Sequence, residues 1–66
     1  MKESSFNYGI MIAASNIVAL HDQPVIAADI IKEAGLANFN CKEMSEYDKE
    51  NLKVVNKEKG MTLRGL

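Results

Sequence analysis

The chain has 66 residues with 47% hydrophobic and 26% charged side chains and a formal net charge of -1, which indicates one ordinary globular domain. The near-neutral charge gives no general attraction to nucleic acid or to an anionic membrane. A single Cys41 and a single His21 exclude an intrachain disulfide and a zinc site with four Cys and His ligands, so we expect no metal and no cofactor.

The small size of the chain predicts a need for additional stabilisation. A domain of this length buries only about 60% of the surface that its unfolded chain exposes, so it is marginally stable alone. Because disulfides and metals are excluded, oligomerisation is the remaining aid, and we expect a homodimer. The lone cysteine fits a reducing compartment, so we place the protein in the cytoplasm.

Residues 6–20, FNYGIMIAASNIVAL, form the most apolar stretch, and their periodicity predicts a first helix over residues 5–20. One face of this helix carries the residues spaced i, i+4, i+7, i+8, i+11 and i+14: Phe6, Ile10, Ala13, Ala14, Ile17 and Leu20. Met11 and Val18 form a second apolar strip beside this face. The stretch is 15 residues long and contains Asn and Ser, whereas about 20 apolar residues are needed to span a bilayer. We therefore expect a buried helix and no membrane contact.

This first helix is apolar on more than one side, which is typical of a helix that several neighbours bury. Two further helices in so short a chain offer too little cover, so we predict that it lies near the two-fold axis of the homodimer. Gly9 and Ala13 have a spacing that allows close helix packing, although a glycine tolerated near the first turn is an equal explanation. The candidate interface residues are Gly9, Met11, Ala13, Ile17 and Val18.

A second helix is predicted over residues 23–34. Pro24 suits its first turn, and Gly35 stands where a helix commonly ends with a left-handed residue, followed by Leu36 as an apolar contact. The residues that we expect on its core face are Val25, Ile26, Ile30 and Ile31. The short connection between the first two helices predicts that they pack as neighbours.

The remainder of the chain predicts a loop, a third helix and a tail. Residues 37–44 have a loop-like composition. Ser45 is expected to cap a third helix over residues 46–59, which Gly60 ends. The tail, residues 61–66, has apolar residues at near-alternating positions, so we expect it to fold back on the core or to form a short extended segment. The predicted fold class is therefore all-α, with three helices and a short C-terminal tail.

The charges of the third helix are sorted along its axis, with acidic residues at its start and basic residues at and beyond its end. This order complements the helix dipole, which is the simpler explanation. The alternative is a small positive patch that contacts phosphate groups or an acidic partner. The candidate contact residues are Lys42, Lys53, Lys57, Lys59 and Arg64.

The segment 30–44, IIKEAGLANFNCKEM, loosely matches a helix-turn-helix motif in which Gly35 would occupy the turn. The recognition helix would then begin near Asn38, with Asn40 and Lys42 able to reach base edges or phosphates. The acidic residues that follow this segment and the near-neutral charge of the chain argue against DNA binding. Ser45, further along the chain, is also a stronger helix start than Asn38.

His21 and Cys41 are the only pair with nucleophile and base potential, and nothing in the sequence places them together. We therefore expect no enzymatic activity. The function that we rank first is that of a small regulatory or inhibitory protein that acts inside the cell by binding another macromolecule, preferably a protein. A helix-turn-helix DNA-binding regulator is the second hypothesis, and a structural oligomerisation module is the third.

Overall fold

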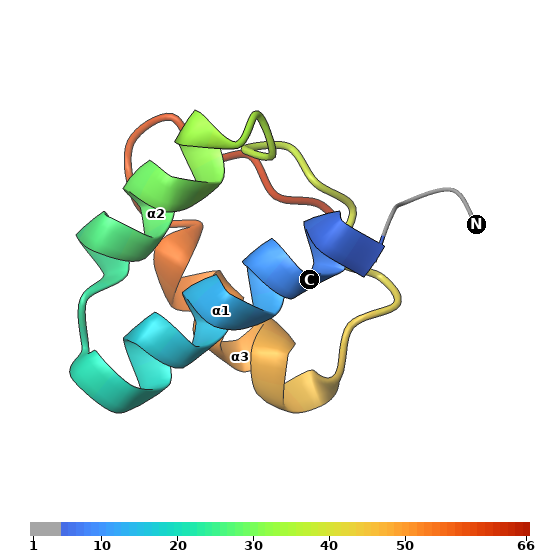
Figure 1. The fold of residues 1–66 in the computed structure, drawn as a ribbon, viewed down its shortest axis with the longest axis horizontal. Helices are drawn as coiled ribbons and strands as arrows, with labels where there is room; N and C mark the ends of the chain where they lie inside the picture. Colours follow the sequence, from blue (N-terminus) through green and yellow to red (C-terminus); the bar gives the residue numbers. More distant parts are fainter. Residues whose placement is uncertain (1–4) are drawn as a thin grey trace.

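A computed structural model describes residues 5–66 and shows three helices, α1 (Ser5–His21), α2 (Pro24–Glu33) and α3 (Glu46–Val55) (Figure 1). No strand is present in these residues, so the prediction of an all-α domain with three helices is confirmed. Residues 22 and 23 join α1 and α2 into a hairpin, and α3 packs against both helices.

The first two helices begin and end within one residue of the predicted bounds. Pro24 is the first residue of α2, and Gly35, with a φ of +75°, follows its end. The N–H of Leu36 donates to the carbonyl of Ile31 (2.9 Å), and the N–H of Gly35 donates to the carbonyl of Lys32 (3.0 Å). This pair of bonds is the Schellman motif, and Leu36 is buried directly after it, as predicted.

The third helix begins where predicted and ends four residues before the predicted residue 59. Ser45 caps its first turn, since the Oγ atom of Ser45 accepts the N–H of Asp48 at 3.2 Å. The predicted end is wrong because Asn56 turns the chain. The Oδ1 atom of Asn56 accepts the N–H of Leu63 at 2.8 Å and so binds the returning tail. Asparagine side chains compete with helical bonding in this way, which lowers their helix propensity.

The C-terminal segment 61–66 runs beside loop residues 37–41, which confirms the predicted return of the tail to the core (Figure 1). Three backbone hydrogen bonds join them, from Thr62 N–H to Ala37 O (2.9 Å), from Arg64 N–H to Phe39 O (3.0 Å) and from Cys41 N–H to Arg64 O (2.7 Å). The pairing is parallel, and it places Met61 and Leu63 in the core.

The buried face of α1 differs from the predicted face. Its buried residues are Met11, Ala14 and Ser15. Phe6 and Leu20, which the periodicity places in the core, are 74% and 71% exposed. At about 100° per residue, Phe6, Ala13 and Leu20 lie on the side of the helix opposite Met11. Apart from the buried Ala14, the predicted face is therefore the outer side of α1, and the predicted second strip is the inner side.

Two contacts made by the inner side of α1 select this orientation. The ring of Tyr8 meets the ring of Phe39 edge-on, with 5.2 Å between the centroids. The Nδ2 atom of Asn51 donates to the Oγ atom of Ser15 at 3.0 Å. Because both partners lie far along the chain from α1, the periodicity of α1 alone could not indicate them.

The inner side of α2 is the predicted one only in part, because Ile31 is buried as expected. Val25, Ile26 and Ile30 are exposed, so their predicted positions in the core are wrong. The buried residues of α2 are Ala27, Ala28 and Ile31. The loop and the tail supply much of the rest of the core: Leu36, Phe39, Cys41, Met44, Met61 and Leu63. With these side chains inside, the domain closes without the larger outer residues of α2.

Replacement of Gly65 tests the docking of the tail. A Cβ atom at Gly65 would lie 2.5 Å from Asn40 Oδ1 and 2.6 Å from the Lys42 nitrogen, and the φ of Gly65 is +75°. We expect Gly65→Ala to lower the free energy of unfolding by about 2–4 kcal/mol, measured by urea denaturation. Gly35→Ala is the matched control, because its φ is the same while nothing lies within 4 Å of its Cβ position. It should cost only about 1 kcal/mol, and equal losses would contradict the docked tail.

Candidate interaction surface

The outer sides of the helices carry large apolar side chains that the domain does not cover. Among the described residues, the exposed ones on the three helices are Phe6, Ile12, Leu20, Val25, Ile26, Ile30, Tyr47 and Val54. Single exposed apolar residues are common on protein surfaces, whereas a continuous group marks a binding surface. The arrangement of these residues on α1 and α2 distinguishes the two cases.

The outer side of α1 presents a continuous apolar stripe. Phe6, Ala13 and Leu20 are exposed, and Ile10 and Ile17 lie half-buried between them and pack partly against the core of the domain. Their successive spacings of 4, 3, 4 and 3 residues keep all five side chains on one side of the helix. We call these five residues the α1 stripe.

Two residues of α2 extend the α1 stripe. Lys32 marks the side of α2 nearest the segment after α3, because its Nζ atom donates to the carbonyl of Lys59 at 3.1 Å. Ile30 and Ile26 are exposed and lie about 160° and 120° around α2 from Lys32. They are therefore on the side of α2 away from the segment after α3, and α1 is the neighbour of α2 in the hairpin (Figure 1). We call the α1 stripe together with Ile26 and Ile30 the α1–α2 face.

Three of the five predicted interface residues lie on the outer side of α1. Gly9 and Ala13 are exposed, and Ile17 belongs to the α1 stripe. A Cβ atom at Gly9 would meet no other atom within 4 Å, so no close packing within the domain requires this glycine. Met11 is fully buried in the domain's own core, and Val18 is half-buried against that core. Met11 therefore stabilises the monomer only, whereas Val18, like Ile10 and Ile17, is half-buried and packs partly against the core.

The rim of the α1–α2 face is neutral along α1 and acidic along α2. Residues 5–20 of α1 include no charged side chain. On α2, Asp29 and Glu33 are exposed and follow Ile26 and Ile30 by three residues, about one helical turn. The face is thus complementary to an apolar surface whose own rim is neutral or basic.

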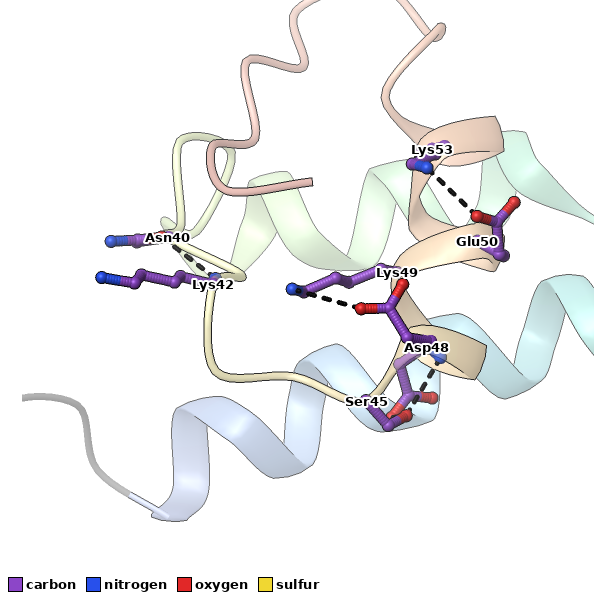
Figure 2. Close-up of polar contacts among 8 residues, drawn as sticks. Asn40, Lys42, Ser45, Asp48, Lys49, Glu50 and Lys53 are labelled. Atoms are coloured by element: carbon purple, nitrogen blue, oxygen red, sulfur yellow. Dashed lines mark hydrogen bonds and ion pairs between the residues drawn. The ribbon is translucent and has the colours of Figure 1, made fainter.

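The five basic residues predicted to contact a partner or phosphates do not form one patch. Lys42 is exposed on the loop and points away from α3, whereas Lys53 on α3 forms an ion pair with Glu50 at 3.1 Å (Figure 2). The Nε atom of Arg64 donates to the carbonyl of Asn38 at 2.9 Å. The other two lie in the turns after α3: Lys57 and Lys59. For Lys53, in the last turn of α3, this distribution favours the explanation from the helix dipole.

The recognition helix required by the helix-turn-helix hypothesis does not form, because residues 36–45 contain no helix. Asn40 forms a backbone bridge with Arg64, and its Oδ1 atom accepts the N–H of Lys42 at 3.0 Å (Figure 2). This asparagine therefore stabilises the loop instead of projecting from a helix. The helix from Asn38 that this hypothesis requires is absent, and residues 37–44 form the predicted loop, because pairing with the tail holds this segment in a non-helical conformation.

The structure does not bring His21 and Cys41 together. Figure 1 shows the end of α1, where His21 lies, and the loop that contains Cys41 on opposite sides of the molecule. Cys41 is fully buried, and this burial raises the pKa of its thiol to about 11, although the charges of Lys49 and Arg64 lower it. The thiol is therefore neutral at physiological pH, and a neutral thiol is a poor nucleophile.

Searches for other kinds of site gave no candidate within residues 5–66. No group of three or more His, Cys, Asp or Glu side chains in this part of the chain could hold a metal ion. None of the helices that the structure describes is long and apolar enough to cross a membrane. Comparison of the chain with protein-family models, with curated proteins and with solved structures gave no match.

The burial of Cys41 predicts slow reaction with iodoacetamide. With a thiol pKa of about 11, the thiolate fraction at pH 8 is about 10⁻³. We expect the folded protein to be alkylated about 100-fold or more slowly than the urea-unfolded chain, measured by mass spectrometry. The neutral thiol contributes stability that is complete below the unfolded pKa of 9.0 and is lost as the pH rises through about 11. Equal alkylation rates would contradict the buried position.

Proposed function

We propose that this chain is a small regulatory or inhibitory protein that acts by binding another protein through the α1–α2 face. The observation that carries the proposal is the position of Phe6 and Leu20, which are largely exposed while Ala14, Ala27 and Ala28 are among the buried residues of α1 and α2. Burial of a Phe or Leu side chain stabilises by about 1.5–3 kcal/mol. The monomer lacks this stabilisation for Phe6 and Leu20, and a partner's apolar surface can supply it.

The chemistry of the rim supports a protein partner over a nucleic acid or a membrane. Phosphates of nucleic acids and anionic lipids are bound by basic groups. The rim of the α1–α2 face has neutral residues along α1 and the acidic Asp29 and Glu33 along α2. An amphipathic helix with an apolar face and a neutral or basic polar side has the complementary charge for this face.

Binding of this kind is sufficient for regulation or inhibition, since a protein that occupies an apolar surface of its partner blocks other ligands of that surface. A reducing compartment such as the cytoplasm remains part of the proposal, and the free, buried thiol of Cys41 is compatible with it. The homodimer predicted from the sequence uses the same kind of contact, because a second copy is also a protein partner.

Affinity capture with matched variants tests the proposal. The tagged wild-type protein, Phe6→Glu and Ile26→Glu serve as baits in extracts of the native host, and captured proteins are identified by mass spectrometry. Val54→Glu is the control, because Val54 is also exposed but lies on α3, outside the α1–α2 face. Circular dichroism establishes that each bait is folded.

We expect a protein that the wild-type bait and Val54→Glu retain equally, and that Phe6→Glu and Ile26→Glu retain about tenfold less. A glutamate carboxylate facing an apolar partner must be desolvated without a compensating charge, which weakens binding. Failure of the wild-type bait to retain any protein above the level of empty beads would count against the proposal. Equal retention by all four baits would show that the binding surface lies elsewhere.

A further inference from the structure

The α1 stripe has the spacing of a coiled-coil seam. Its residues follow one another at intervals of 4, 3, 4 and 3, so Phe6, Ala13 and Leu20 occupy d positions and Ile10 and Ile17 occupy a positions of the heptad repeat. Such a seam packs best against a helix with the same spacing. The other two described helices, α2 and α3, already pack against α1 from its other sides, so a matching helix must come from another molecule.

We propose that the α1 stripe is covered by the α1 stripe of a second copy of this chain, around a two-fold axis that passes near Ala13. This inference rests on the proposed function only in that both use the α1–α2 face. It names a second copy of the chain as the protein that covers the part of this face formed by α1. In a two-fold interface the same surface meets itself, so the surface must be complementary to itself. The steric profile and the charge of α1 each fulfil that requirement.

The sizes of the side chains along the α1 stripe suit a second helix that crosses α1 at the centre of the stripe. The largest exposed side chains lie at its two ends, Phe6 and Leu20, and the small Gly9 and Ala13 lie between them. When two helices cross at small residues, their backbones approach closely, and the larger residues on either side pack against the neighbouring helix. Gly9 has open space around its Cβ position in the monomer, and close approach of a second helix would give this glycine a packing role.

The charge distribution avoids the electrostatic repulsion that arises when two identical charged surfaces pair. Each chain has a formal net charge of -1, but residues 5–20 of α1 contribute no charged side chain to it. Two α1 stripes therefore meet without like charges opposite each other. The exposed Asp29 and Glu33 lie on α2, on the side of Ile26 and Ile30 away from α1.

The area that a stable dimer buries limits how the two copies can meet. A standard interface buries about 800 Å² on each partner, which is about a fifth of the 4121 Å² surface of this domain. The 17 residues of α1 extend about 25 Å, so the α1 stripe offers a long surface for this contact.

The purified chain alone tests this proposal by sedimentation equilibrium at micromolar concentrations. We expect the wild type to have a mass near twice 7.3 kDa. Ala13→Glu should raise the dissociation constant of the dimer about 100-fold or more, because the two-fold axis brings the two carboxylates together in an apolar interface. Ala19→Glu is the matched control, since Ala19 is exposed on α1 but lies outside the α1 stripe, and it should remain dimeric.

A wild type that stays monomeric overturns the proposal, and so does Ala13→Glu that dimerises as the wild type does. Because Ala13 is exposed in the monomer, Ala13→Glu should keep its helical circular dichroism spectrum. Filtered NOE measurements on a mixture of isotopically labelled and unlabelled wild type give an independent reading that needs no variant. Contacts between copies at Phe6 and Leu20 support the proposal, and contacts confined to α3 overturn it. A monomeric chain that still captures a different protein would refute the second copy and leave the proposed function standing.

Discussion

Backbone hydrogen bonds between residues 37–41 and the returning tail close this domain at one end of the helix hairpin, and the packing of the helices depends on them. They hold Phe39 and Cys41 inside on one segment and Met61 and Leu63 inside on the other. These side chains fill the space that the inner sides of α1 and α2, rich in alanine and other small residues, leave open. The core does not need the larger residues on the outer sides of both helices, and these exposed residues make up the candidate binding surface.

The parts of the fold that could be predicted depend on interactions between residues close together in the sequence. The left-handed Gly35 with the buried Leu36, the cap at Ser45 and the near alternation of the tail are all local signals, and each agrees with the structure. Helix bounds that depend on a distant partner could not be predicted. The early end of α3 follows from the bond between Asn56 and Leu63, which nothing near residue 56 reveals.

The candidate surface could likewise be predicted only where it depends on residues close together in the sequence. Five of the six residues that the periodicity of α1 places on one face form the α1 stripe, whereas the sixth, Ala14, is buried. The periodicity could not tell whether that side of the helix faces inward, because α1 is apolar around much of its circumference and both orientations bury apolar area. Phe39 and Asn51, which settle the orientation, lie on other segments. The basic residues do not form one patch for a related reason, since the turns after α3 separate residues that are close in the sequence.

The hydrogen bond between Ser15 and Asn51 helps to fix the rotation of α1 about its own axis. If α1 turned by about half a revolution, Phe6 and Leu20 would enter the core and Met11 would leave it, while the exposed amide of Asn16 would turn inward. The turn would also separate the hydroxyl of Ser15 from the part-buried amide of Asn51, and a buried polar group left unpaired costs about 1–3 kcal/mol. Together with the contact between Tyr8 and Phe39, this polar pair gives a helix that is apolar around much of its circumference one preferred rotation, and with it a defined side that faces outward.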